Sequence, residues 1–513
     1  MMNKTGLLLL LILSFLTGNA QTKDASLDSL FTRLHREGNW NGNVLIAQNG
    51  KILYRKSFGY ADFAKKTPNT DASRFQTAST SKVFTSTAVL QLVEQGKVKL
   101  NEPFVRYFPE FPFPGITLRH LLSHTSGLPD LELYEPMVRK YPDTLVTNAV
   151  TIAALRDWKK PLHFKPGEQW EYCNVNYHLL ALLVEKVSKM PFGAYLKQYI
   201  FRPAGMMQTY LKEPLHPMAD KSLVTNHLLP TMYHTVPVNA ETVQLKDLVM
   251  QWKFRFEQYS IMGPVGSANV ITTTEDLLKF DQALYTSKLL SQPTLALAFT
   301  PTQLNNGETY YGEMEIDYGG KTSYGLGWVV RQDAKRGTIV GHDGYTGSMA
   351  TTFYRNLTQK QTVIMFDNTV GSHYREKVAS AINILNGELP LPIPIKKSAV
   401  RLFGEALLQK GPEKALVCLN TWRSDTTRYY FTEREMNVLG YEFLFNGYSA
   451  QSLETFKINT LLFPTSFNVY DSYGDAFAQI GRKEEAILMF QRAIALNPES
   501  EGSKQSLKKL LEK

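Results

Sequence analysis

The chain of 513 residues is 43% hydrophobic and 12% aromatic, which is enough apolar material for more than one folded core. Its formal net charge is +9, but acidic and basic residues are interspersed, and no long run of Lys or Arg could follow a nucleic-acid backbone. We therefore expect at least two domains and no nucleic-acid partner.

The first twenty residues have the parts of an export signal. Lys4 supplies the positive charge, an apolar stretch covers 7–16, and small residues lead to a cleavage site after Ala20. The apolar stretch is too short for an ordinary membrane span, and no cysteine lies near the cut to carry a lipid. We expect a signal peptide at 1–20 and a periplasmic or secreted protein without a membrane span after cleavage.

The next elements are a hairpin and a helix. The stretch 43–60 has the pattern of two strands joined at Asn49-Gly50, because a type I′ turn needs two residues that tolerate positive φ. From Ser79 onward apolar residues recur at helical spacing until Gly96, which stands where a left-handed cap belongs. Ser79 is thus predicted at the amino terminus of a helix.

A second strand-rich block follows much later in the chain. Its predicted strands cover 324–331, 338–341, 349–354 and 362–366, and a helix at 374–385 closes it. The region between the two blocks reads mostly as helices and loops. This order predicts one sheet whose strands come from distant parts of the chain, an all-helical lobe, and a site in the cleft between them.

A proline-rich linker at 387–397 forbids a helix and weakens strand pairing, so we place the main domain boundary there. It separates a domain at 21–386 from a helical domain at 398–513. In the second domain a pattern recurs with a period of 34 residues, at about 433–466 and 467–500, and it resembles tetratricopeptide repeats.

Two repeats bury a continuous core poorly, so we expect them to dock on 398–430 or on the first domain. The repeats are either a surface for a protein partner or a stabilising helical tail without one. The sequence leaves both readings open.

Three short motifs carry the chemistry. Ser79-x-x-Lys82 places a hydroxyl and an amine one helical turn apart, but alone this pattern is weak. Tyr172-x-Asn174 and a histidine at 342, followed by Asp and Gly, come later in the chain. Connecting phrases accompany these motifs, at 75–78, 118–128, 273–277 and 324–328.

With these residues the sequence resembles the serine β-lactamase and penicillin-binding protein superfamily, in particular its class C β-lactamase, DD-peptidase and esterase branch, over about 25–385. The resemblance implies an α/β sandwich, in which an antiparallel sheet is flanked by helices and joined to the helical lobe. It also implies a serine hydrolase that needs no cofactor and no metal.

The resemblance assigns roles to single positions. Ser79 is the nucleophile, and the backbone amides of Ser79 and Tyr345 form the oxyanion hole. Asn174, Asp343 and Gly344 are expected to contact the substrate.

The base that takes the serine proton is either Tyr172 or an uncharged Lys82, because the two groups would titrate together, and Asn174 should orient the lysine. His342 stands where β-lactamases of this branch usually carry a lysine, and Asp343 replaces a hydroxyl residue. A mostly neutral histidine binds a substrate carboxylate less well than a lysine, so we expect weak β-lactamase action.

The remaining cysteines and histidines are interpreted as structural. Cys173 and Cys418 cannot form a disulfide framework, and no bridge between them is expected. Cys173 is read as a packing residue rather than a second nucleophile, since no activating base is identified. His120 and His124 are read as hydrogen-bonding residues rather than zinc ligands.

Two functions follow from the sequence. The first is a hydrolase that acylates Ser79 with an amide or ester, such as a D-amino-acid peptide or a small acyl ester. The second is a penicillin-binding sensor or scaffold with slow turnover, whose repeats recruit a partner.

Overall fold

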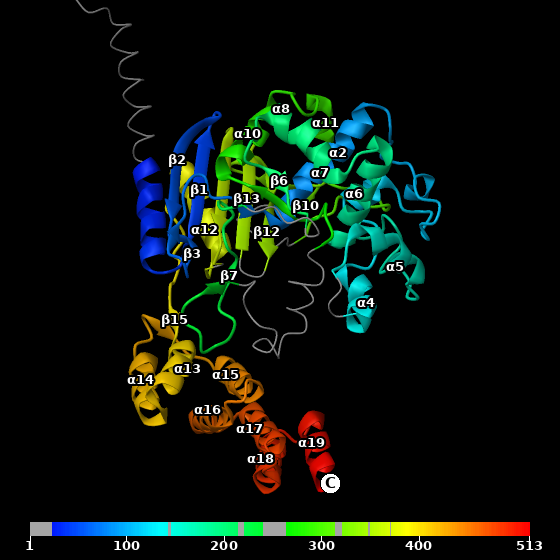
Figure 1. Cartoon of the computed structure of the whole chain (residues 1–513). Helices are drawn as coiled ribbons and strands as arrows, with labels where there is room; N and C mark the ends of the chain where they lie inside the picture. Colours follow the sequence, from blue (N-terminus) through cyan, green and yellow to red (C-terminus); the bar gives the residue numbers. More distant parts are fainter. Residues whose placement is uncertain are drawn as a thin grey trace, which may run out of the picture. The chain divides into compact units, whose positions relative to one another are not determined.

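The computed structural model describes residues 23–141, 145–213, 220–239, 263–312, 321–346, 349–369 and 371–512 (Figure 1). The predicted signal peptide at 1–20 lies outside these residues. The chain divides into two compact units. Unit 1 comprises Met1–His227 and Phe256–Ile393, and unit 2 comprises Leu228–Arg255 and Pro394–Lys513. Within the described ranges, no helix has the length and apolar character that a membrane crossing requires.

Unit 1 is built on a seven-stranded antiparallel sheet with the order β10-β11-β12-β13-β14-β1-β2. The strands are β1 (Gly42–Gln48), β2 (Lys51–Phe58), β10 (Lys321–Tyr324), β11 (Val329–Asp333), β12 (Gly337–Thr346), β13 (Met349–Asn356) and β14 (Gln361–Asp367). Because β1 pairs with β14, the two ends of the unit meet inside one sheet. This confirms the predicted antiparallel sheet made from distant segments.

The predicted hairpin forms between β1 and β2. Asn49 and Gly50 both have positive φ, at 54° and 74°, and Gln48 pairs with Lys51 across the two-residue turn. This is the conformation that a type I′ turn requires. The short turn fixes the register that places the apolar residues of β1 in the core.

Helices cover both faces of this sheet, since every residue of β13 and β14 is buried. Helix α10 (Thr274–Tyr285) packs on β14 and β1, and Phe280 brings its ring to Trp328 and Phe353. Helix α12 (Tyr374–Leu385) also packs on β14, and a helix at 23–36 contributes Phe31 to the core. A mixed α/β fold with a central antiparallel sheet results.

A helical lobe stands beside the sheet in unit 1 (Figure 1). It contains α2 (Lys82–Glu94), α3 (Leu118–Leu122), α4 (Glu135–Lys140), α5 (Thr151–Asp157), α6 (Asn174–Ser188) and α7 (Phe192–Leu196). Helix α2 is buried on nearly all sides and contacts α6, α7 and β12, so it lies between lobe and sheet. Smaller elements complete the unit: β3 (Tyr60–Asp62), β4 (Thr67–Pro68), β5 (Phe75–Gln76), β6 (Tyr210–Leu211), β9 (Val270–Thr272), α8 (Arg202–Ala204) and α11 (Gln292–Ala298).

Unit 2 is helical. Its helices are α13 (Ala399–Lys410), α14 (Pro412–Ser424), α15 (Glu433–Phe445), α16 (Ser449–Leu462), α17 (Phe467–Gln479), α18 (Lys483–Leu496) and α19 (Glu501–Leu511). The pair α15 and α16 begins at 433 and 449, and α17 and α18 begin at 467 and 483, so the hairpin recurs after 34 residues. Helix α13 shares a buried cluster with α15 and so covers the first hairpin.

The two hairpins repeat one close contact. A Cβ atom on Gly440 would lie 2.6 Å from the ring of Phe456, and one on Gly474 would lie 3.0 Å from the ring of Phe490. A small residue is therefore needed where the helices of each hairpin cross. The assignment of these helices to tetratricopeptide repeats stays a prediction.

One segment inside the predicted domain at 21–386 belongs to the helical unit instead. Residues Leu228–Arg255 belong to unit 2, although hydrolase-like sequence flanks them on both sides. Met232 is buried in the helical core, Tyr233 stacks on Phe443 at 5.0 Å, and Arg401 donates to the carbonyl of His234. Met232 and Tyr233 complete the core around α13 and α15, a long-range effect that local sequence patterns do not reveal.

Candidate active site

Ser79 lies in a single 3₁₀ turn, Ala78–Ser81, that leads into α2. The α-helix itself begins at Lys82, three residues later than the sequence pattern suggested. Ala78 adopts a left-handed conformation with φ of 45°, which is rare outside glycine. The sharp turn leaves Ser79 partly exposed while Lys82 becomes fully buried.

Two neighbouring strands hold this turn in place. The Thr351 hydroxyl on β13 donates to the carbonyl of Thr77 at 2.8 Å, and the Thr80 hydroxyl donates to the carbonyl of His342 at 3.2 Å. A Cβ atom on Gly344 would lie 2.9 Å from the Ser79 nitrogen. The backbone of β12 thus lies directly against the Ser79 amide, beside Tyr345, and only glycine fits at 344.

Lys82 contacts Ser79, Asn174 and Ser267 through its side-chain nitrogen. Its ammonium nitrogen lies 3.1 Å from Ser79 Oγ, 2.8 Å from Asn174 Oδ1 and 3.1 Å from the carbonyl oxygen of Ser267. Burial lowers the pKa of Lys82 to about 7, although the negative charge of Asp130 acts in the opposite direction. Near neutral pH a large fraction of Lys82 is therefore an uncharged amine.

Asp130 fixes the orientation of Asn174. One carboxylate oxygen accepts from the Asn174 backbone amide at 2.5 Å, and the other accepts from the Asn174 side-chain amide at 3.1 Å. The side-chain carbonyl of Asn174 is left to accept from Lys82. Burial raises the pKa of Asp130 to about 6.

Tyr172 and His124 form the aromatic wall of the site. The Tyr172 ring lies 4.7 Å from the Lys82 nitrogen, 4.4 Å from the His124 ring and 6.2 Å from the His342 ring. His124 Nδ1 accepts from the backbone amide of Cys173, so a neutral ring carries its proton on Nε2. Burial, with Lys82 nearby, lowers the pKa of His124 well below its usual value.

His342 is a buried neutral imidazole. Its Nε2 lies 3.0 Å from the Tyr324 hydroxyl, and its Nδ1 lies 2.5 Å from the carbonyl of Asp343. Burial, together with the charge of Lys82, lowers the pKa of His342 to about 3. The ring therefore brings a hydrogen-bonding group, but no positive charge, to the site.

Asp343 is the predicted substrate contact that the structure places elsewhere. Its carboxylate accepts from the Thr352 hydroxyl at 2.6 Å and from the Tyr354 hydroxyl, both on the neighbouring strand β13. Successive side chains of a strand point to opposite faces, so Asp343 faces away from the side occupied by His342. The expected contact between Asp343 and substrate stays a prediction, and these two hydroxyls already engage its carboxylate.

The other cysteine and histidine positions have packing and hydrogen-bonding partners. Cys173 and Cys418 are free thiols, and burial raises the pKa of Cys173 well above its usual value, which keeps it protonated. His120 accepts from the Thr117 backbone amide and caps α3. Within the parts of the chain that the structure describes, no three His, Cys, Asp or Glu side chains gather as a metal site.

Sequence reasoning missed the second layer of the site. His178 Nε2 lies 2.9 Å from the Ser267 hydroxyl, and His178 Nδ1 lies 3.0 Å from the Tyr134 hydroxyl. This chain of contacts holds the residue whose carbonyl accepts from Lys82. Asp130 lies two residues after the connecting phrase at 118–128, a signal that could have drawn attention to it.

The structure therefore brings together five of the predicted site residues: Ser79, Lys82, Tyr172, Asn174 and His342. It also places the β12 backbone at Gly344 against the Ser79 amide. Asp343 alone among the predicted side chains is directed elsewhere.

Known proteins are similar to this chain in sequence and in fold. The family model described as "Beta-lactamase" matches residues 27–385. A penicillin-binding protein of Bacillus subtilis (strain 168) is 34% identical over 407 residues, which cover 76% of this chain and 84% of that protein.

Two solved structures extend the comparison. A penicillin-binding protein from Bacillus halodurans is 25% identical with a TM-score of 0.56, over 69% of this chain and 98% of that one. An octameric penicillin-binding protein homologue from Pyrococcus abyssi is 26% identical with a TM-score of 0.59, over 71% of this chain and 78% of that one. The family match over most of unit 1 shows that this chain belongs to the beta-lactamase family of serine acyl-transferring and hydrolytic enzymes.

Proposed function

We propose that this chain is an exported serine hydrolase that forms an acyl-enzyme on Ser79 and releases the acyl group to water. The observation that carries the proposal is the 3.1 Å contact between the Lys82 nitrogen and Ser79 Oγ. An amine with a pKa of about 7 can accept a proton from the attacking hydroxyl at neutral pH. Export rests on the sequence of residues 1–20.

Lys82 is the base that this geometry favours. Asn174 and Ser267 both accept hydrogen bonds from its nitrogen, which accounts for two N–H bonds of a neutral amine. The nitrogen lone pair is then left for the Ser79 proton. Tyr172, whose ring lies next to the same nitrogen, is assigned to pass that proton to the leaving group.

In the acylation step the serine proton moves to Lys82 and a proton reaches the leaving group through Tyr172. Ser79 Oγ bonds to the substrate carbonyl carbon while its proton moves to Lys82, and the backbone amides of Ser79 and Tyr345 stabilise the oxyanion. The bond to the leaving group then breaks as the leaving group takes a proton through Tyr172. Water repeats the attack on the ester and frees Ser79.

The substrate is an amide or ester that does not depend on a permanent cation in the site, such as a D-amino-acid peptide or a small acyl ester. His342 is neutral, and its Nε2 is engaged by Tyr324. Its Nδ1 is engaged by the carbonyl of Asp343, so the ring offers a substrate carboxylate neither an ion pair nor a free N–H donor. We therefore propose weak β-lactamase action, in keeping with the class C, DD-peptidase and esterase branch.

A second candidate is a penicillin-binding sensor or scaffold with slow deacylation. It is supported by the relative at 34% identity, which is named a penicillin-binding protein, and by a helical unit that could present a surface to a protein partner. In this case the function would depend on a protein partner bound by the repeats and not on substrate turnover.

One experiment separates the two candidates. Purified protein is given p-nitrophenyl acetate and, separately, a fluorescent penicillin, and released product is compared with labelled protein. Continued turnover that is lost in Ser79→Ala supports the hydrolase, whereas labelling that stops after one equivalent supports the sensor. Turnover that persists in Ser79→Ala would refute both.

A further inference from the structure

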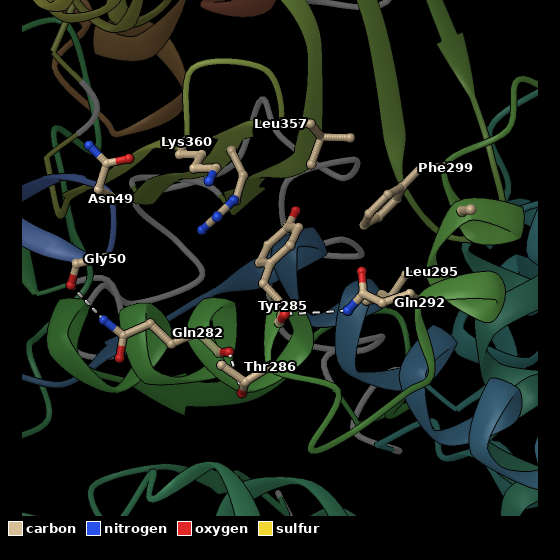
Figure 2. Close-up of a pocket in the computed structure, with 12 residues that line it drawn as sticks. Asn49, Gly50, Gln282, Tyr285, Thr286, Gln292, Leu295, Phe299, Leu357 and Lys360 are labelled. Atoms are coloured by element: carbon tan, nitrogen blue, oxygen red, sulfur yellow. Dashed lines mark hydrogen bonds between the residues drawn. The ribbon is translucent and has the colours of Figure 1, made fainter.

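Unit 1 contains a cavity of about 590 Å³ that the proposed reaction does not use (Figure 2). It opens where the β1–β2 turn and the β13–β14 turn approach the ends of α10 and α11. Arg355 lines it from β13, four residues beyond Thr351, which contacts the nucleophile's turn. At about 3.3 Å per strand residue, the two positions are roughly 13 Å apart.

Hydrogen bonds fix the walls of this cavity. Gln282 on α10 donates to the carbonyl of Gly50 in the β1–β2 turn at 2.8 Å (Figure 2). Gln292 on α11 donates to the carbonyl of Tyr285 at 3.3 Å and to the Ser287 hydroxyl at 3.0 Å. The helices and the turn are therefore tied together before any ligand arrives.

The charged side chains of the lining are positive, and the Asp281 carboxylate behind Arg355 balances the charge of that guanidinium. Arg355 and Lys360 are its charged side chains, and no acidic side chain is among the described residues that line it. The Arg355 guanidinium lies 3.6 Å from the centre of the Tyr285 ring and donates through Nη1 to the fully buried Asp281. Among the described residues, none accepts a hydrogen bond from its Nη2.

The opposite wall is apolar. Leu295, Ala296 and Phe299 line it from α11 and the residue that follows this helix, and Leu357 lines it from the β13–β14 turn. Phe299 is braced edge-on by the buried Trp328 at 5.2 Å. A cationic floor beside an apolar wall suits a molecule with one anionic end and one apolar end.

We propose that this cavity is a second binding site, separate from the acyl site, for a small carboxylate with an aromatic or aliphatic tail. The carboxylate pairs with Arg355 and Lys360, and the tail packs against Leu295 and Phe299. Asp281 holds the guanidinium from behind, so Arg355 is oriented before binding. An oriented guanidinium is a preferred partner for a carboxylate.

Calorimetric titration of the full chain with phenylacetate, hexanoate and the neutral phenylacetamide tests the proposal. Both carboxylates should bind one per chain with millimolar or tighter affinity, and phenylacetamide should bind at least about tenfold more weakly because it lacks the charge. Ser79→Ala should bind the carboxylates as well as the unaltered chain does, because Ser79 does not line this cavity.

Three variants test whether the ligand binds in this cavity. Ala296→Trp starts from an exposed position on the cavity wall and should remove binding by filling the space. Lys360→Gln should weaken binding severalfold, whereas Lys335→Gln, at an exposed turn outside the cavity, should leave it unchanged. Equal binding of the amide, binding that survives Ala296→Trp in a folded variant, or no binding of either carboxylate would overturn the proposal.

Discussion

Asp130 holds Asn174 at both of its amide groups, although the two residues are 44 positions apart in the chain. The same carboxylate approaches the Val175 amide at 3.4 Å, so it also caps the amino terminus of α6. Since the Asn174 carbonyl accepts from Lys82, the orientation of the Lys82 amine depends on a residue that is not among the hydrogen-bond partners of Ser79. Asp130 is thus a positioning residue.

Replacing Asp130 with alanine should lower kcat by about 10- to 100-fold, as for other residues that orient a functional group from behind. Without the carboxylate, the Asn174 amide can rotate and present its NH₂ group to Lys82. Unfolding should become easier by about 1 kcal/mol because α6 loses its cap. Steady-state kinetics on an activated ester and thermal melts check both effects.

Asp130→Asn is the conservative comparison, because it keeps the shape but can no longer accept from both amides. It should lie between the wild type and the alanine variant in kcat. Asp157→Asn, at an exposed position, is the matched control. Full activity in Asp130→Ala would show that Asn174 needs no support from this carboxylate.

Lys82→Met should reduce acylation by about 10²- to 10⁴-fold, the usual contribution of a general base. The change removes a buried charge and keeps a similar side-chain length, so thermal stability should stay equal or rise. Burst kinetics with p-nitrophenyl acetate measure the acylation rate directly. Lys186→Met, at an exposed position on α6, controls for the loss of one lysine.

A slow reaction in Lys82→Met with unchanged melting would separate a catalytic role from a structural one. An acylation rate within a few-fold of the wild type would instead move the role of base to Tyr172. Tyr172→Phe then becomes the decisive variant.

Many residues of this site could be predicted because they belong to short motifs in the sequence. Ser79 and Lys82 are one turn apart, and Tyr172 and Asn174 flank a single residue, so each pair is brought together by short-range geometry. The antiparallel sheet followed in the same way from the strand patterns and the Asn49-Gly50 turn.

The parts that escaped prediction depend on contacts across the chain. Asp130 caps a helix that begins 44 residues later, whereas most helix caps are adjacent in sequence. Met232 joins a core whose other members lie beyond residue 398. The motif gives the position of Asp343 in the sequence but not its hydrogen bond from Thr352 on the neighbouring strand.

The pH dependence should report the lowered pKa of Lys82. As the base must be uncharged, kcat/KM should rise with pH through an apparent pKa near 7 and then level off. The folded pKa of about 7 lies below the ordinary value of 10.5, so between these values the unfolded chain binds more protons. Stability from this group therefore rises as pH increases from about 7 toward 10.5, and its destabilising effect is complete below 7.

Lys82→Met should abolish both behaviours. The pH–rate profile of its residual activity should no longer rise through an apparent pKa near 7. The difference in unfolding free energy between wild type and variant should shrink as the pH rises above 7. Denaturant unfolding at several pH values and a pH–rate profile measure the two. A limb near pH 7 that persists in the variant would assign this ionisation to another group.

His342→Lys tests why the site should prefer substrates without a required carboxylate. A lysine at this position would supply the permanent cation that the neutral imidazole lacks, so kcat/KM for a penicillin should rise about tenfold relative to a neutral ester. His342→Gln can keep a hydrogen bond to Tyr324 without adding charge and should show no such gain. Because both variants lose the imidazole, the ratio of the two substrates within each variant isolates the effect of charge. An unchanged ratio in a folded His342→Lys variant would mean that the substrate carboxylate, if present, is bound elsewhere in the site.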